Sequence, residues 1–196
     1  MNRYLILCLT FAFGLVGALP AYAELGSGTY KIDQSHSKVG FEIAHMVFSS
    51  VEGRFKSFSG DLQVNSKKKV VNVTVEVASI NTEEPKRDKH LRSPDFFNAA
   101  KYPDMIFKSS KITGNTHGNF KIHGKLTLHG ITRPLVLKAK YLGEGKDPWG
   151  NMRYGFKASG HLVRQDFGLK WNKLAEAGPL VGDDVELSIK LELVKQ

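Results

Sequence analysis

The sequence contains a single cysteine, Cys8, and Cys8 lies in an N-terminal segment that we expect to be removed. Residues 24–196 then have no thiol, so they form no disulfide bond and use no cysteine nucleophile. Their stability must come from a buried core, and a chain of this length is long enough to build one as a single domain.

An apolar run long enough to span a bilayer is also missing. The N-terminal run covers residues 4–19, which is shorter than the roughly 20 residues that a spanning helix needs. Arg3 precedes this run, and an A-x-A sequence follows it at residues 21–23. We therefore predict a secretory signal peptide at residues 1–23 and one exported domain at residues 24–196, with a membrane anchor as the alternative.

Familiar catalytic motifs are absent. The sequence has no G-x-S-x-G elbow, no P-loop and no dinucleotide-binding fingerprint. Glu42, Asp61 and Asp166 have no partner at catalytic spacing. We predict that the protein is not an enzyme and uses no cofactor.

The seven histidines form no metal-binding pattern. His123 and His129 face the same way on one predicted strand, but six residues of strand separate them by roughly 20 Å. Metal–ligand bonds are about 2 Å long, so one ion cannot bridge that pair. The H-E-x-x-H and zinc-ribbon spacings are missing too, and we predict no metal site.

Acidic residues are fewer than basic ones, since the sequence has 19 Asp and Glu but 28 Lys and Arg. The formal net charge is +9, which removal of Arg3 lowers by one. A basic surface suits anionic lipid headgroups, a diphosphate or nucleic acid, although a merely soluble surface is the simpler explanation. Many Phe residues fall on inward faces rather than between exposed cations, so we predict no nucleic-acid partner.

Apolar residues alternate with polar ones over most of residues 28–193, which predicts antiparallel β-structure. Eight or nine segments show this pattern, at residues 29–32, 39–45, 62–64, 71–77, 105–107, 120–128, 135–141, 154–162 and 185–193. Turn signals separate them at residues 65–66, 114–115, 129–130, 143–145 and 182–183. Such a series closes into a barrel because closure removes exposed edges; a two-sheet sandwich is the alternative.

One segment, residues 85–98, breaks the alternation and predicts a helical turn or two. Ser93, Pro94 and Asp95 offer an N-cap, a first-turn proline and an acid that suits the helix dipole. Phe96 and Phe97 need an apolar surface to cover. In a barrel, we expect this segment at one mouth, as a plug or lid.

Eight short motifs, in their order and spacing, resemble the YceI-like family of exported proteins. They are RDKHLRS at residues 87–93, DFFN at 95–98, KYP at 101–103, FKS at 107–109, GRF at 53–55, FSG at 58–60, GKLTLHGITRP at 124–134 and DFG at 166–168. The resemblance covers essentially everything after residue 23. It implies an all-β, eight-stranded antiparallel, lipocalin-like barrel in the periplasm, with an apolar interior that holds an isoprenoid or similar lipid chain.

The resemblance and the inward parity of the strands together predict the ligand-binding residues. These are Val39, Phe41, Ile43, His45, Phe55, Phe58, Val73, Val75, Arg87, His90, Phe96, Phe97, Phe107, Phe120, Leu128, Leu137, Phe156, Leu187 and Ile189. Each ligand CH₂ group buried in such a tunnel contributes about 0.8 kcal/mol, so strong binding needs no hydrogen bond.

The predicted function is to hold an isoprenoid or quinone-like chain for transport, storage or sequestration. The alternative is an accessory role in membrane electron transfer, in which the barrel presents a quinone to a redox partner. The expected partner is a hydrophobic lipid ligand. A transient contact with the membrane or a membrane protein, and a homodimer, are left open.

His45 shares the inward face of residues 39–43. At that place it would meet the polar head of a ligand or, as we favour, hydrogen-bond to the backbone within the core.

Charged residues of the helical segment allow two interpretations. Arg87 and His90 share a helical face that excludes Asp88, which argues against a catalytic triad, and we predict a surface pair between Asp88 and Arg92. The basic cluster of residues 86–92 is instead a hypothetical site for a diphosphate or quinone head at the barrel mouth, because cationic donors suit anionic oxygens.

Overall fold

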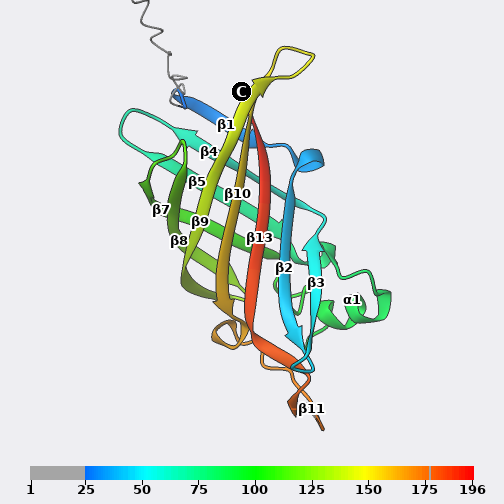
Figure 1. Cartoon of the computed structure of the whole chain (residues 1–196). Coiled ribbons are helices and arrows are strands. Elements are labelled where there is room, and N and C mark those ends of the chain that lie inside the picture. The colour runs from blue at the N-terminus through cyan, green and yellow to red at the C-terminus, as the bar shows by residue number, and fades with distance from the viewer. Residues whose placement is uncertain (1–24, 177) are drawn as a thin grey trace, which may run out of the picture.

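The computed structural model describes residues 25–176 and 178–196, and the predicted signal peptide lies outside these described residues. Antiparallel strands, one α-helix and short 3₁₀ turns make up the described fold (Figure 1). The elements are β1 (Gly28–Ile32), η1 (Gln34–His36), β2 (Lys38–His45), β3 (Ser49–Phe55), β4 (Phe58–Val64), β5 (Lys69–Glu76), η2 (Val77–Ser79), β6 (Ile80–Asn81), α1 (Pro85–Arg92), β7 (Asp104–Gly114), β8 (Asn119–Leu128), β9 (Ile131–Lys146), β10 (Met152–Val163), η3 (Arg164–Phe167), β11 (Leu174–Ala175), β12 (Gly178–Pro179) and β13 (Val181–Lys195).

Eight of these strands close into a barrel. They pair in the order β1, β4, β5, β7, β8, β9, β10 and β13, and β13 pairs with β1 to complete the ring. Ile32 of β1 lies opposite Leu193 of β13, and each pairing in the ring is antiparallel. The predicted eight-stranded barrel is confirmed, and closure excludes the open sandwich.

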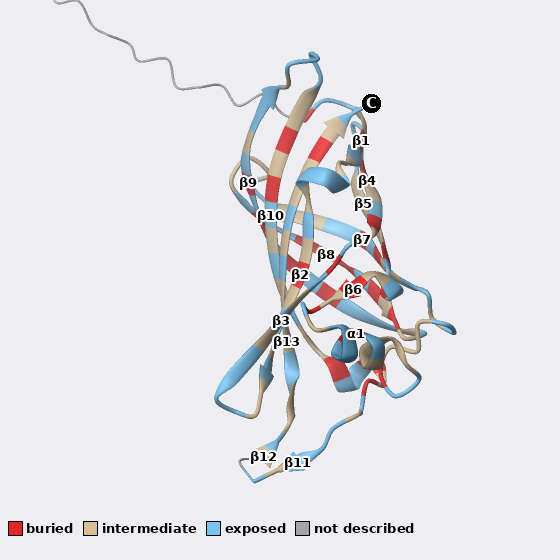
Figure 2. Ribbon diagram, turned by 90° about the vertical axis from the view of Figure 1, so that its right-hand side faces the viewer, coloured by how far each residue is buried: buried red, intermediate tan, exposed pale blue. Residues whose placement is uncertain are grey.

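Strand β13 joins the two halves of the barrel. Its 15 residues span about 50 Å. Its C-terminal residues pair with β1, whereas Ile189 and its neighbours pair with β2. Strands β1 and β2 therefore follow one another along β13, with the turn η1 between them. Strands β3 and β6 continue the wall beyond β2, and α1 packs beside β6 at that end of the barrel (Figures 1 and 2).

Strand β3 was not predicted from the alternation of apolar and polar residues. Its inward positions hold Ser49, Val51, Gly53 and Phe55, so serine and glycine interrupt the apolar alternation. The structure explains this glycine, because a Cβ at Gly53 would lie 2.3 Å from Cζ of Phe41 on the paired strand β2. The phenyl ring of Phe41 therefore occupies the place of the missing side chain.

Helix α1 starts earlier than the cap signals predicted. Its N-cap is Glu84, whose carboxylate accepts hydrogen bonds from the backbone N–H groups of Lys86 and Arg87, and Pro85 occupies the first turn. Ser93 ends α1 in an extended conformation before Pro94. It also begins the next turn, because its hydroxyl accepts a hydrogen bond from the backbone N–H of Asp95 and its carbonyl accepts one from that of Phe96. The cap predicted at residues 93–95 therefore belongs to a single turn at residues 94–97, after the helix.

Two predicted turns lie inside strands. Strand β9 continues through residues 143–145 to Lys146, and the chain reverses only at residues 147–151, where the Asp147 carboxylate accepts hydrogen bonds from the backbone of Trp149 and Asn151. Residues 182–183 belong to β13, which carries a register irregularity there. In each case glycine or aspartate marks an irregular strand rather than a reversal.

Large aromatic side chains fill the barrel at the end away from α1. Tyr30 is fully buried, its ring packs edge-on against Tyr154 at 5.2 Å between centroids, and its hydroxyl donates to the carbonyl of Gly26 at 2.7 Å. Phe156 contacts both Phe120 and Tyr141 in the same cluster. Figure 2 shows the buried residues of β10 and β13 at this end.

We predict that Gly124→Ala destabilises the barrel by about 1–3 kcal/mol, because the core has no room for the added methyl group. A Cβ at Gly124 would lie 2.5 Å from Cζ of Phe107 and 2.6 Å from the backbone oxygen of Lys108. Gly145→Ala is the matched control, since no heavy atom lies within 4 Å of that position. Urea denaturation measures both changes, and equal stability of the two variants would contradict this packing argument.

Candidate functional site

A cavity of about 320 Å³ lies inside the barrel next to α1. Side chains from β2, β3, β5, β7, β8, β9, β10, β13 and α1 line it, and nearly all of them are apolar. A second cavity, of about 70 Å³, adjoins it toward the aromatic end, and Val71, Ile122, Ala158 and Leu191 border both. The free space is therefore elongated along the barrel.

Sixteen of the nineteen predicted ligand-binding residues line the larger cavity. They are Val39, Phe41, Ile43, His45, Phe55, Val73, Val75, Arg87, His90, Phe96, Phe97, Phe107, Leu128, Leu137, Leu187 and Ile189. Three lie elsewhere. Phe120 and Phe156 border the smaller cavity, and Phe58 is buried in a cluster with Phe55, Val75 and Ile80. Strand parity predicted that Phe120 and Phe156 point inward but carries no information on depth along the barrel, and Phe58 was predicted from the family resemblance.

The polar side chains of the cavity gather at the α1 end. Arg87 donates from Nε to Oγ1 of Thr82 and from Nη2 to the Thr82 carbonyl, each at 2.7 Å. Thr82 in turn donates from its backbone and hydroxyl groups to buried Asp88, at 2.8 and 2.6 Å. This chain of hydrogen bonds fixes the Arg87 guanidinium at the cavity rim.

The predicted surface pair between Asp88 and Arg92 is wrong. Asp88 is buried and accepts hydrogen bonds from Thr82, while Arg92 donates to the carbonyl of Ala78 at 3.1 Å. The chain before α1 folds back over the helix, so each side chain finds a partner there that helical spacing alone does not reveal.

His45 lines the cavity but is not the backbone-bonded core histidine that we favoured. Its ring is half-buried, and Nδ1 lies 3.4 Å from the hydroxyl of exposed Ser49. The reason is position, because β2 ends at His45 and the following turn leaves one side of the ring open. His45 therefore adds a polar group to the rim of the cavity.

Arg164 and Trp171 were missed as site residues. Arg164 is only 2% exposed and donates to the carbonyls of Gly182, Leu169 and Trp171 at 2.5–2.9 Å. Burial lowers the pKa of the Arg164 guanidinium, and Asp183, 3.0 Å away, opposes that effect. Arg164 thus holds the segment after η3 against β13, and its place two residues before the DFG motif was the available signal.

An aromatic cluster borders the mouth of the cavity. The Trp171 ring lies 4.9 Å from the His90 ring and 5.0 Å from the Phe96 ring, between centroids. Nε2 of His90 also lies 3.4 Å from the Asp95 carboxylate. Together these contacts connect α1, the turn after it and the segment held by Arg164.

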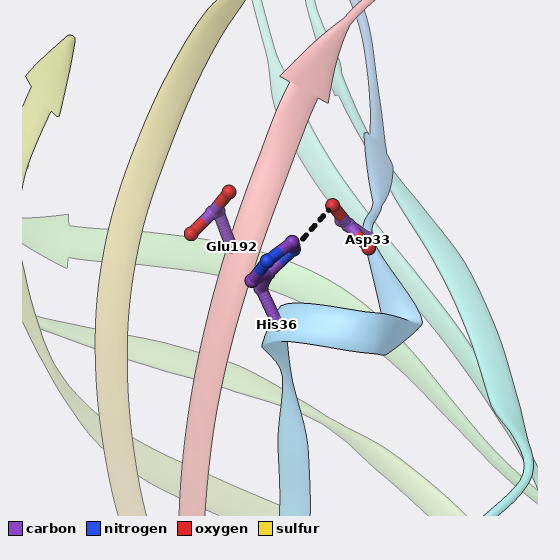
Figure 3. Close-up of side chains that lie close together, drawn as sticks. All are labelled: Asp33, His36 and Glu192. Atoms are coloured by element: carbon purple, nitrogen blue, oxygen red, sulfur yellow. Dashed lines mark hydrogen bonds and ion pairs between the residues drawn. The ribbon is translucent and has the colours of Figure 1, made fainter. Parts of the chain in front are cut away.

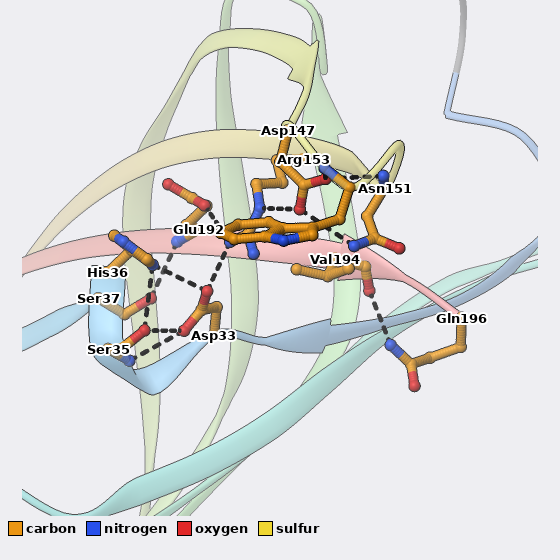
Figure 4. A network of polar contacts seen from close by, with 11 residues as sticks. Asp33, Ser35, His36, Ser37, Asp147, Asn151, Arg153, Glu192, Val194 and Gln196 are labelled. Carbon is orange, nitrogen blue, oxygen red and sulfur yellow. Dashed lines mark hydrogen bonds and ion pairs between the residues drawn. The ribbon is translucent and has the colours of Figure 1, made fainter.

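A second polar centre lies outside the barrel. Asp33, His36 and Glu192 place their potential ligand atoms within 4.8 Å of one another, which is compatible with a cation (Figure 3). Nη1 of Arg153, however, contacts the Asp33 and Glu192 carboxylates at 2.5 Å, and its Nε contacts Asp147 at 2.8 Å (Figure 4). The guanidinium already supplies the positive charge between these acids, so the group is an ion-pair network.

The network shifts the pKa values of its members. Hydrogen bonds from Ser35, Arg153 and His36 hold the pKa of Asp33 far below its ordinary value. Burial raises the pKa of Asp147, but hydrogen bonds from Arg153 and Asn151 outweigh this effect and lower it to about 2. Hydrogen bonds to Asp33 and Asp147 in turn raise the pKa of Arg153.

The barrel and its internal cavity define a lipocalin-like architecture. The chain belongs to the YceI-like domain family, whose model matches residues 30–193. It is similar to the protein YceI of Escherichia coli, with 40% identity over 196 residues and 97% of each chain covered. A relative from Photorhabdus laumondii, of the UPF0312 group, is 39% identical over the full length of both chains.

Two solved structures are similar to this fold. The Campylobacter jejuni YceI protein is 34% identical, with a TM-score of 0.67 over 84% of this chain and 96% of that one. A domain from Saccharophagus degradans, described as polyisoprenoid-binding, has a TM-score of 0.66 at 13% identity and covers 85% and 98% of the two chains. In the part of this chain that the structure describes, no helix has the length and apolar character needed to cross a bilayer.

We predict that Arg153→Met lowers the melting temperature at pH 7 and that this deficit shrinks as the pH falls from about 4 toward 2. The sign follows from Asp33 and Asp147, whose folded-state pKa values are depressed. Their stabilisation is present above the unfolded-state pKa and is lost as the pH falls through the folded-state value. Thermal unfolding across this pH range tests the prediction.

Arg54→Met is the control, because Arg54 and Glu83 form an exposed pair at 3.3 Å that should contribute little. A deficit in Arg153→Met that stays constant from pH 7 to pH 2 would contradict the role of the network.

Proposed function

We propose that this protein binds one hydrophobic lipid, an isoprenoid or an isoprenoid quinone, with its chain inside the barrel. The single observation that carries the proposal is the apolar cavity of about 320 Å³, which has Thr82, Arg87 and His90 at its α1 end. An amphiphile with a long apolar chain and a small head matches that distribution. The role of the complex is transport, storage or sequestration of the lipid rather than catalysis.

The cavity favours a flexible apolar chain for energetic reasons. Its volume lies at the lower end of the range found for small-molecule sites. Each buried CH₂ group contributes about 0.8 kcal/mol, so a few isoprene units suffice for micromolar or tighter binding. Selectivity would then depend on the length and branching of the chain, because the wall offers few hydrogen-bonding groups.

Arg87 and His90 are the groups that would meet the head of such a lipid. Both line the cavity at the α1 end, and Arg87 is held there by Thr82. A guanidinium suits a diphosphate or a quinone carbonyl, since it donates several hydrogen bonds in one plane. His45 and Trp171 lie on the same rim and would complete the surroundings of the head.

Two further points support the proposal. The Saccharophagus degradans domain, described as polyisoprenoid-binding, has the same barrel, so this architecture is compatible with a prenyl chain. The N-terminal sequence, with its apolar run and A-x-A site, suits export. We propose a periplasmic location, where a carrier would shield a lipid chain from water.

The test is a titration with farnesol and farnesyl diphosphate. Ala158→Trp should weaken binding of both ligands by about tenfold or more, because the new ring fills the space where the two cavities meet. Arg87→Gln combined with His90→Gln should weaken binding of the diphosphate more than of the alcohol. Isothermal calorimetry gives both affinities.

Ser159→Trp is the matched control, since Ser159 is the next residue of β10 and is exposed on the outer face. It should bind both ligands like the unmodified protein. If Ala158→Trp folds with an unchanged melting temperature and still binds both ligands fully, the cavity is not the site. An equal loss of affinity for the two ligands in the Arg87 and His90 variant would contradict the proposed contact with the head.

A further inference from the structure

The smaller cavity continues the larger one toward the aromatic end of the barrel. It holds about 70 Å³, against about 320 Å³ for the larger cavity, and Val71, Ile122, Ala158 and Leu191 border both. At its other end the larger cavity reaches its mouth beside α1. A chain whose head stays at that mouth therefore reaches the smaller cavity with its far end.

Small side chains leave a passage between the two cavities. Ala139 of β9 and Ala158 of β10 lie opposite each other in the barrel wall. Ala139 is buried and borders the smaller cavity, while Ala158 borders both cavities. Because a methyl group extends only a short way from the wall, this layer of the barrel remains open.

Aromatic rings occupy the next layer. Phe156 lies two residues from Ala158 along β10, and Phe120 of β8 lies opposite Ala139. The two phenyl rings meet edge-on at 6.2 Å between centroids, and they border the smaller cavity but not the larger one. Phe156 also packs against Tyr141 at 5.4 Å, within the buried cluster that fills this end. These packed rings limit the space available beyond the passage.

The polar groups of the smaller cavity lie at its border. Nζ of Lys69 is 3.4 Å from the hydroxyl of Thr116, and both residues border this cavity. Asp61 and Lys157 border it from positions of outward parity on β4 and β10. From the α1 end, all four lie beyond the apolar passage, where a charged head would lose its water. The smaller cavity therefore suits the apolar end of a chain rather than its head.

We propose that Phe120 and Phe156 set the length of the prenyl chain that this protein binds, with the last isoprene unit in the smaller cavity. Units up to that length are buried, and any further unit extends from the α1 mouth into water. The length limit rests on the proposed function, since it requires a chain in the barrel. It adds the residues that determine which chain fits.

A series of prenyl alcohols tests the proposal, from geraniol with two isoprene units through farnesol and geranylgeraniol to longer homologues. Each competes with radiolabelled farnesol for the purified protein. In the unmodified protein, each added unit should raise the affinity by about tenfold or more until the smaller cavity is full, and by less than about threefold beyond that length. We call the length at which the affinity stops rising the break.

Two substitutions should move the break in opposite directions. Phe156→Ala should move it to a chain one unit longer, because removal of the ring enlarges the smaller cavity. Ala139→Leu should move it to a chain one unit shorter, because the added side chain fills that cavity. Since Ala139→Leu adds apolar atoms to free space inside the core, it tests the proposal even if Phe156→Ala fails to fold.

Phe58→Ala is the matched control, because Phe58 is buried like Phe156 but borders neither cavity. It should lower the melting temperature as Phe156→Ala does, since both remove a buried phenyl ring. The break should stay where it is in the unmodified protein. A loss of stability alone therefore does not reproduce the expected shift.

The possible failures are distinguishable. If the unmodified protein binds no prenyl alcohol, the proposed function is wrong and the length limit with it. If the alcohols bind but the break is absent, or stays in place in Phe156→Ala and Ala139→Leu, the length limit alone is wrong.

The orientation of the chain is tested with Lys69→Gln. It should leave the preference for farnesyl diphosphate over farnesol unchanged, because the head lies at the α1 mouth. If Lys69→Gln removes that preference and the Arg87 and His90 variant keeps it, the head lies in the smaller cavity, and the proposal is overturned.

Discussion

The closure of the sheet by pairing β13 with β1 is the constraint on which the rest of the structure depends. Once the ring is closed, every second side chain of each strand points inside, and no sheet edge within the ring is open to solvent. The interior is then filled only as far as those side chains reach. The same strand β13 also pairs with β2, so the wall extends past the closed ring toward α1.

The size of the inward side chains decides where the barrel is solid and where it is hollow. Near one end, Tyr30 packs against Tyr154 and Phe156 packs against Tyr141, all within one buried cluster. Toward α1 the inward positions of β5, β10 and β13 include Val73, Ala158 and Val185, which are too small to meet across the barrel, and the cavity lies there. Of the polar groups that line it, Arg87 and His90 lie at the α1 end, whereas buried Arg164 is hydrogen-bonded to backbone carbonyls.

Alternation of apolar and polar residues predicted the barrel and the inward side chains, because strand parity is a local property. Depth along the barrel is not local, so parity could not show that Phe120 and Phe156 border the smaller cavity rather than the larger one. Contacts between distant segments were equally hidden. Three contacts depend on how the folded chain brings distant loops together. They are the Asp33–Arg153 ion pair, the hydrogen bond from Thr82 to Asp88 and the hydrogen bonds of buried Arg164.

Native mass spectrometry of the protein isolated from its own cells, followed by extraction of any bound lipid, tests the central claim most directly. The account predicts a complex of one protein with one lipid, and the extracted lipid should carry a prenyl chain. A protein that is isolated empty and stays empty when prenyl lipids are offered would contradict it, even though the barrel itself would stand.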